Sequence, residues 1–234
     1  MISENKTKKR FILVGGCPPN AAEMKHAGGQ VTATLELMEY ALEQDFVLDI
    51  IDTTQTSFPM LSIKTRLFRG IKRIFKIYGF LRKNKYDGAI IFTSASISFL
   101  ERTIMALACR IFGLKTVLLL RDGNPIFHIK NSKIWFWFYK ILSKIPNWVA
   151  AQGQPWEAFY KSLGVSPKKI VIIRNWLPKK HLQAVSKIKN HPKSFSAPFS
   201  FLFVGWMIKE KGIFELLKAF QNSEILKNNS KLVD

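Results

Sequence analysis

Short apolar runs alternate with longer segments of helical periodicity along the first three quarters of the chain. The short runs are apolar throughout, without polar alternation, which is typical of strands buried on both faces of a sheet. The longer segments repeat apolar residues every three to four positions, which predicts helices. The runs predict strands at 11–14, 46–51, 89–92, 116–120, 148–151 and 170–173. The periodic segments predict helices at 31–42, 63–81, 99–112, 134–142 and 156–163.

This alternation predicts an α/β domain over residues 1–178, with a parallel sheet covered by helices on both faces and the size of one Rossmann-like domain. Residues 179–198 are polar, basic and proline-bearing without apolar periodicity, which predicts a linker. A strand at 199–204, a charged loop and a helix from about 212 to 220 then open a second Rossmann-like domain. About 35 residues cannot bury both faces of that strand, so we expect the second domain, at 199–234, to be incomplete.

Charge and composition narrow the function classes. The 234 residues include 36 Lys and Arg against 16 Asp and Glu, a net charge of +20. Residues 1–60 are slightly acidic, so the positive excess lies in the later part and indicates a negatively charged partner. Two cysteines and four scattered histidines make neither a disulfide framework nor a metal site, and we expect no metal and no cofactor. No uncharged apolar run reaches the roughly 18–20 residues that span a bilayer.

The segment 64–85 carries nine Lys and Arg and no acidic residue. One helical sector is apolar and is expected to pack on the sheet; it holds Ile63, Leu67, Ile71, Ile74, Tyr78 and Leu81. The opposite sector is basic and is predicted to contact an anionic membrane surface; it holds Arg66, Arg69, Lys72, Arg73, Lys76 and Lys83. A merely solvated basic face is the alternative. The aromatic run 134–139 suits either the lipid–water interface or the core.

Two glycine-containing turns are candidate phosphate sites. Gly28 and Gly29 stand immediately before a predicted helix, where backbone amides and the helix dipole favour an anion, although a plain tight turn is equally compatible. Gly205 ends the strand at 199–204, and Lys211 and Gly212 precede the next helix, so a cation lies beside a helix N-terminus where it suits a diphosphate. The nicotinamide fingerprint Gly-x-Gly-x-x-Gly is absent, which disfavours a plain NAD site.

These segments resemble glycosyltransferases of the GT-B fold, specifically family 4, over nearly the whole chain. Gly28-Gly29 with its following helix resembles the family's N-terminal glycine loop, and Lys85-Tyr86-Asp87 fits the approach to its third strand. The stretch 164–175, which ends in Arg174-Asn175, resembles a family segment that ends in Pro-Asn-Gly. The most specific match is the segment 203–212, with Ala219-Phe220 downstream, which resembles the start of the family's nucleotide-binding domain.

The resemblance implies a UDP- or GDP-linked sugar donor between two domains and transfer with retention, without a metal; no Asp-x-Asp occurs here, in agreement. Lys211 would bind the donor diphosphate and stabilise it as it leaves. Gly28, Gly29, Asn175, Gly205 and Gly212 would complete the phosphate contacts. Arg121 and Asp122 stand where the family often has a histidine near the reacting sugar. Arg121 is thus a candidate for binding a phosphate and Asp122 for orienting an acceptor hydroxyl, with a salt-bridged pair as the alternative.

Three departures from the family pattern bear on activity. Trp206 replaces a basic residue, Trp176 replaces the glycine after Asn175, and the family's two glutamates separated by seven residues would lie beyond the end of this chain. The sequence predicts a transferase that builds a bacterial surface polysaccharide or a lipid-linked glycan at the cytoplasmic face of the cell membrane. The alternatives are an inactive truncated remnant, a partner subunit whose donor site a second chain completes and, as a lesser alternative, a basic nucleic-acid-binding α/β protein.

Overall fold

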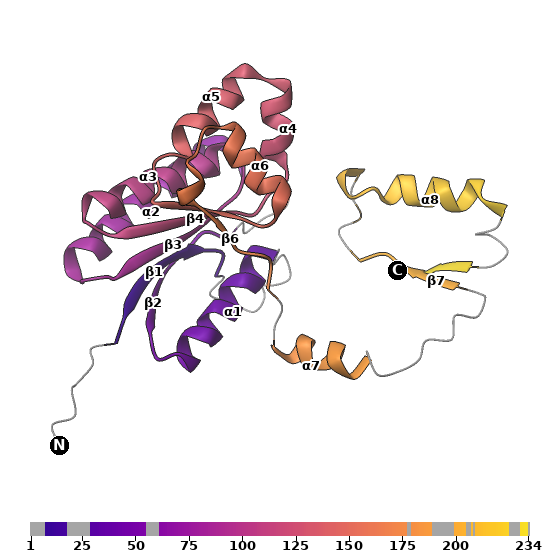
Figure 1. Cartoon of the computed structure of the whole chain (residues 1–234), viewed down its shortest axis with the longest axis horizontal. Coiled ribbons are helices and arrows are strands. Elements are labelled where there is room, and N and C mark those ends of the chain that lie inside the picture. The colour runs from indigo at the N-terminus through magenta and orange to yellow at the C-terminus, as the bar shows by residue number, and fades with distance from the viewer. Residues whose placement is uncertain are drawn as a thin grey trace. The chain divides into compact units, whose positions relative to one another are not determined.

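The computed structural model in Figure 1 describes residues 8–17, 29–54, 61–176, 179–188, 199–204, 207, 209–224 and 230–233. The chain divides into two compact units, Met1–Pro178 and Lys179–Asp234.

The first unit is a six-stranded parallel sheet flanked by helices (Figure 1). The strands lie in the order β2-β1-β3-β4-β5-β6, so the direction of the connections reverses between β1 and β3. The strands are β1 Arg10–Gly15, β2 Val47–Asp52, β3 Gly88–Thr93, β4 Lys115–Leu120, β5 Trp148–Ala151 and β6 Ile170–Ile172. The helices are α1 Gly29–Glu43, α2 Ile63–Lys83, α3 Ile97–Ile111, α4 Asn124–Asn131, α5 Lys133–Leu142, α6 Gln154–Ser162 and the short η2 Pro167–Lys169.

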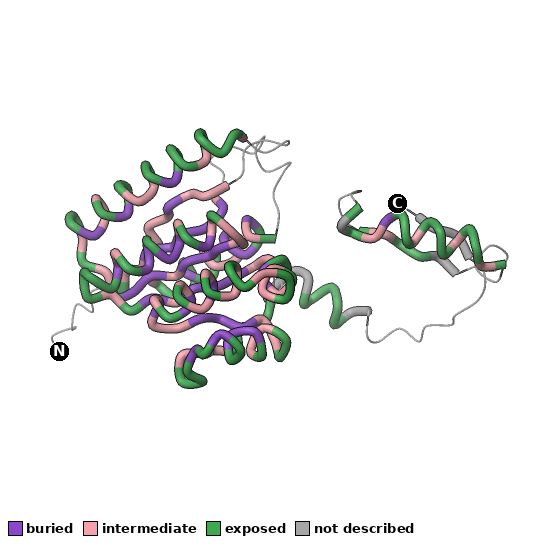
Figure 2. Tube along the Cα trace, turned by 90° about the horizontal axis from the view of Figure 1, so that it is seen from above, coloured by how far each residue is buried: buried purple, intermediate pink, exposed green. Residues whose placement is uncertain are grey.

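Two apolar clusters hold the layers together, one on each face of the sheet. The larger cluster joins the strands to α2, α3, α5 and α6 through residues such as Ile77, Phe99 and Tyr139, all fully buried. The smaller cluster joins the other face to α1 through Ala33 and Leu37. Figure 2 shows the buried residues gathered along the strands and the inner sides of the helices. The predicted parallel sheet with helices on both faces is therefore confirmed.

Close contact between β1 and α1 depends on a glycine. A Cβ atom built on Gly15 would lie 2.6 Å from Oγ1 of Thr34 and 3.1 Å from the ring of Phe92, which no real side chain tolerates. Because Gly15 has no side chain, the end of β1 packs directly against α1. This packing holds the start of α1 beside the carboxyl ends of the strands.

The structure corrects the predicted orientation of α2. Ile63, Leu67, Ile71 and Tyr78 were expected to pack on the sheet, but all four are exposed, by 44% to 68%. The buried residues of this helix are Gly70, Ile77 and Leu81. A Cβ atom on Gly70 would lie 3.2 Å from Cδ of Glu101, so α2 approaches α3 closely at this glycine. That approach turns the row through Arg66, Gly70, Arg73 and Ile77 inward and leaves the apolar row outside.

Two further segments differ from the sequence prediction. α4 was not predicted, because its eight residues span barely two turns and bury only Pro125. The segment 179–198 was expected to lack periodic structure throughout, but its first ten residues form the helix α7 Lys179–Ile188. Helical periodicity over ten residues with few apolar positions is a weak signal, which accounts for the error.

The second unit also contains β7 Phe199–Leu202, the short helix η3 Lys209–Lys211, α8 Ile213–Asn222 and β8 Ser230–Val233. β7 and β8 pair in parallel, so the unit adds a second strand to the predicted strand, loop and helix. The rings of Phe201 and Phe220 lie 5.5 Å apart, edge to face, and attach α8 to β7. Gly212, the N-cap of α8, has φ +77°, a left-handed conformation that glycine adopts without strain.

Candidate functional site

A cleft of about 560 Å³ opens in the first unit where the strands end. Residues that follow β1, β2, β3, β4 and β5 line it, among them Gly16, Thr54, Ser94 and Arg121. Open α/β sheets bind ligands at the carboxyl ends of their strands, where the order of connections reverses. The reversal between β1 and β3 lies within this cleft, and its volume is within the range of about 300–1,000 Å³ that is usual for small-molecule sites.

Among the described residues, five arginines and a single carboxylate line the cleft. α2 supplies Arg66, Arg69 and Arg73, α3 supplies Arg102 with Glu101, and Arg121 follows β4. The sequence predicts that these three arginines of α2 contact a membrane; in the structure they line the cleft, with Arg66 and Arg73 half-buried and Arg69 exposed. The other members of that set, Lys72, Lys76 and Lys83, are exposed and do not line the cleft.

Glu101 is the centre of an ionic network. Its Oε1 and Oε2 accept hydrogen bonds from Nε and Nη2 of Arg73 at 2.7 and 3.0 Å. Burial alone would raise the pKa of Glu101, but the hydrogen bonds from Arg73 and the charge of Arg102 outweigh it, and the pKa is lowered. The carboxylate is therefore ionised at neutral pH. Its single charge is already paired with Arg73 through a bidentate contact.

Arg102 is the most deeply buried charged side chain of the cleft, with 5% of its surface exposed. Nη1 forms an ion pair with Oε1 of Glu101 at 2.5 Å. Nε is buried and makes no hydrogen bond to any described residue. Burial lowers the pKa of Arg102, although a guanidinium keeps its proton at neutral pH. A buried charge with unused donors favours an anionic ligand.

Arg121 is held by rings rather than by a carboxylate. Its Cζ lies 5.6 Å from the ring centre of Phe92 and 5.1 Å from that of Trp176. Burial lowers the pKa of Arg121, and no neighbouring charge contributes to this shift. Asn175, another predicted phosphate contact, lines the same cleft. The two predicted residues therefore share one site.

Asp122 is occupied differently from either sequence interpretation. Its Oδ2 accepts a hydrogen bond from the amide of Ala95 and its Oδ1 one from the amide of Asn124, both at 3.0 Å. Within the described residues it forms no salt bridge with Arg121, so the alternative of a salt-bridged pair is wrong. The carboxylate fixes the β3–α3 loop. Ser96 in that loop has φ +61° and donates its amide to the hydroxyl of Tyr139 at 3.1 Å.

Two helices begin at the cleft. Gly29 and Gln30 at the start of α1 line it, and so do Ile97 and Ser98 at the start of α3. The N-cap residue of α3 supplies no side-chain hydrogen bond to the first turn. Helix N-termini carry partial positive charge and unsatisfied amides, so both add to the attraction that the arginines exert on an anion.

The remaining predicted phosphate contacts belong to the second unit or lie outside the described residues. Lys211 is exposed and ends η3, immediately before Gly212 at the start of α8. Gly28 and Gly205 lie outside the described residues. No group of three His, Cys, Asp or Glu side chains in the described part of the chain is placed to hold a metal ion.

Sequence reasoning missed Arg102 and Glu101. An adjacent charged pair in the middle of the largely apolar helix 97–111 is the signal that could have identified them. The spacing of Arg66, Arg69 and Arg73 also placed all three on one face of α2, but it could not say which way that face turns.

Comparison with known proteins identifies the fold. No protein-family model matches the sequence, and no curated protein matches it. Three similar solved structures are sucrose-phosphate synthase from Thermosynechococcus elongatus, UDP-N-acetylglucosamine 2-epimerase from Rickettsia bellii, and HepE of Anabaena in complex with UDP and glucose. Their identities to this chain are 13%, 12% and 12%, and the TM-scores are 0.62, 0.51 and 0.50.

These matches cover 96% or 97% of this chain. In turn, the chain spans 61% of the synthase, 69% of the epimerase and 60% of HepE. Structural similarity at this low sequence identity shows the fold alone, and a fold by itself does not determine an activity. The chain therefore has the GT-B type of fold, with a Rossmann-like first unit and the beginning of a second.

Proposed function

We propose that this chain is part of a glycosyltransferase that moves a sugar from a UDP- or GDP-linked donor to a lipid-linked or polysaccharide acceptor. The first unit would hold the acceptor, and the second unit would contribute to the donor site. The observation that carries the proposal is the placement of Lys211 and Gly212 directly before α8 in a chain of GT-B fold. HepE of Anabaena was solved with UDP and glucose, which supports a nucleotide-linked donor.

Lys211 suits the departing diphosphate for electrostatic reasons. An exposed ammonium group at the N-terminus of a helix adds a full charge to the partial charge of the helix dipole. Negative charge develops on the diphosphate as the bond to the sugar breaks, and fixed cations stabilise that transition state more than the ground state. No metal is needed for this step in the proposal.

A binding measurement with UDP and GDP tests the donor assignment. Lys211→Ala should weaken binding of the preferred nucleotide about 10- to 100-fold, because a hydrogen bond to a charged group contributes about 1.5–3 kcal/mol. With an acceptor in hand, transfer should fall at least about 100-fold.

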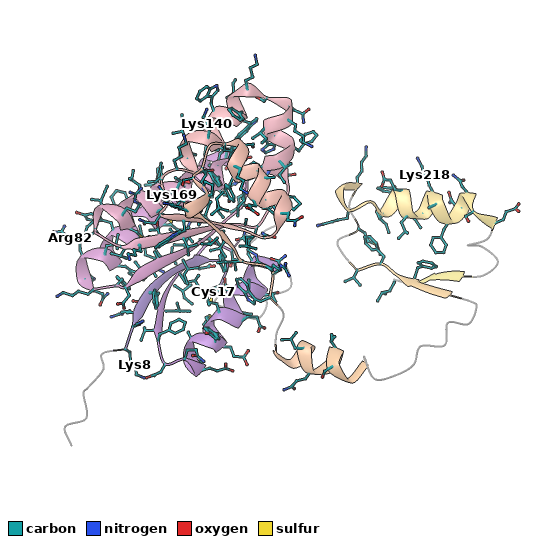
Figure 3. All side chains as sticks on the ribbon, viewed as in Figure 1. Lys8, Cys17, Arg82, Lys140, Lys169 and Lys218 are labelled. Atoms are coloured by element: carbon teal, nitrogen blue, oxygen red, sulfur yellow. The ribbon has the colours of Figure 1, made fainter. Side chains whose placement is uncertain are left out.

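Lys218→Ala is the matched control, since Lys218 projects from α8 into solvent (Figure 3) and lies outside the predicted site. Equal effects of the two replacements, or no binding of either nucleotide, would contradict the donor assignment. Conversion of UDP-N-acetylglucosamine in the absence of any acceptor would favour an epimerase instead.

We further propose that the protein binds the inner face of the cell membrane through an outer apolar face. This face consists of the exposed apolar rows of α2 and α3, two helices that pack together. Phe75 on α2 is 72% exposed and Ile111 on α3 is 74% exposed, and Tyr78 and Phe112 join the rows through ring contact at 5.6 Å. The members are Ile63, Leu67, Phe68, Ile71, Phe75, Tyr78, Leu100, Ile104, Leu107, Ile111 and Phe112.

Basic side chains accompany this face, which favours an anionic lipid surface as its partner. Lys72 lies over the ring of Phe68 at 4.6 Å, and Arg82 lies over that of Tyr78 at 5.5 Å. Arg82 projects from the end of α2 at the outer edge of the unit (Figure 3). Each basic residue near an anionic leaflet contributes about 1 kcal/mol to the free energy of membrane binding, and burial of apolar side chains in the lipid contributes further. No helix in the described residues is long and apolar enough to cross a membrane.

A further inference from the structure

We propose that the arginine-lined cleft of the first unit binds a phosphate or diphosphate group carried by the acceptor. That the acceptor carries it rests on the proposed function, whereas the anion site itself stands on the geometry of the cleft. The occupant is defined by chemistry: a phosphate ester with at least two negative charges, of which a prenyl diphosphate is one form.

The balance of charge in the cleft supports an anion. Among the described residues that line it, five arginines accompany one glutamate, and Arg73 and Arg102 both pair with that glutamate. Arg121 has ring contacts but no carboxylate partner among the described residues, and the side chain of Arg66 likewise forms no ion pair there. Like charges that lie this close together repel one another, and a multivalent anion relieves that repulsion.

Arg102 is the strongest single indication of a built site. It is 95% removed from solvent and lines the cleft; Nη1 pairs with Glu101, but Nε has no hydrogen bond to any described residue. Buried polar groups are nearly always satisfied, and exceptions call for a ligand or a functional reason. Guanidinium groups bind phosphate oxygens through two parallel hydrogen bonds, which an ammonium group cannot reproduce.

The surroundings of the arginines fit a phosphate ester better than an isolated carboxylate. The N-termini of α1 and α3 both begin at the cleft and contribute backbone amides. Thr53 and Ser98 also line it, and their hydroxyl groups are suited to a sugar or to phosphate oxygens. At about 560 Å³, the cleft is larger than one phosphate requires, so it has room for the group that the phosphate is attached to.

The arginine-lined cleft and the outer apolar face share one helix. Arg66 lines the cleft, and Leu67 and Phe68, the next residues of α2, are exposed on the apolar face. Leu61 lines the cleft just before this helix begins. A lipid diphosphate can therefore place its charged group among the arginines while its chain stays with the lipid that the apolar face contacts.

Titration calorimetry with inorganic pyrophosphate tests the anion site. The measurement uses the chain with Lys211→Ala, so that the proposed donor site does not contribute. Adding Arg66→Gln should weaken pyrophosphate binding about 10- to 100-fold, because one charge-assisted contact is lost. Lys72→Gln removes the same charge from the same helix outside the cleft, and it should change binding by less than about twofold.

The outcomes separate the possible failures. If pyrophosphate does not bind, or if Arg66→Gln and Lys72→Gln weaken its binding equally, the proposal of an anion site is overturned. Farnesyl diphosphate and UDP then distinguish the source of the phosphate in the chain with native Lys211. Arg66→Gln should weaken the binding of farnesyl diphosphate and change the affinity for UDP by less than about twofold. An equal loss of affinity for UDP would overturn the acceptor assignment. Failure of both UDP and GDP to bind, with pyrophosphate binding intact, would refute the proposed function but not the anion site.

Discussion

The two sides of α2 differ in a way that hydrophobic periodicity does not anticipate. The side toward α3 and the sheet carries Arg66, Arg73 and Gly70, whereas the side toward solvent carries Leu67 and Phe75. A helix of an ordinary soluble domain shows the opposite distribution. Charged residues can face inward when a cleft or a buried counter-charge receives them. Apolar residues can face outward when another surface covers them. Both exceptions occur on this helix, and they are the basis on which we propose two binding surfaces.

The outer side of α2 gives the prediction with the largest expected effect. Phe75→Asp should weaken binding to vesicles of phosphatidylglycerol and phosphatidylcholine about 100-fold. Lost apolar burial contributes about 1.5–3 kcal/mol, and repulsion between the new carboxylate and the lipid adds about 1 kcal/mol. Cosedimentation at low salt measures the effect, and thermal unfolding should be nearly unchanged because Phe75 is exposed.

Leu42→Asp is the matched control for this prediction. Leu42 is 84% exposed at the end of α1, on the opposite face of the sheet, and its replacement introduces the same charge. Equal losses for the two variants would show that charge alone governs binding and would contradict the membrane role of α2. Binding to single-stranded or duplex nucleic acid that matches or exceeds binding to vesicles would favour the nucleic-acid alternative.

The inner side gives a smaller effect, on stability. Arg102→Met should raise the free energy of unfolding by about 1–3 kcal/mol: it breaks the ion pair with Glu101, but it removes a buried charge whose Nε has no partner among the described residues, and it keeps a similar volume. For a domain of this size, this corresponds to an increase in Tm of roughly 2–12 °C. Glu101 keeps its bidentate contact with Arg73 in the variant. A calorimetric scan measures the change.

The same variant should bind pyrophosphate more weakly, so stability and binding move in opposite directions. Such opposition is usual for a functional site, where groups are held in arrangements that the fold alone does not favour. A clear fall in Tm would instead show that Arg102 serves the α2–α3 contact, and the inner side of α2 would then be structural rather than a ligand surface.

Most of the fold could be predicted from the sequence because continuous apolar runs and helical periodicity are local signals. All six strands of the first unit and five of its helices lie within a few residues of their predicted positions. α4 was not predicted because it is short, and β8 was not predicted because it has few apolar residues. The second strand of the smaller unit therefore became evident only from its pairing with β7.

The site was less predictable, since its residues come together through tertiary contacts. Arg121 and Asn175 follow predicted strands, so the rule that ligands lie at strand ends could identify them. The arginines of α2 required knowledge of Glu101 on α3 and of the close approach at Gly70. Asp122 shows the converse case, because a carboxylate beside an arginine suggests a salt bridge, while this one binds loop amides.

The most direct test of the central claim, that the inner side of α2 is a ligand surface, is arginine labelling with phenylglyoxal. Labelling of individual residues is followed by mass spectrometry with and without pyrophosphate. We expect pyrophosphate to protect Arg66 and Arg121 as it saturates the protein and to leave Arg82, on the outer side of α2, unaffected. Equal protection of all three arginines, or protection of none, would contradict the account.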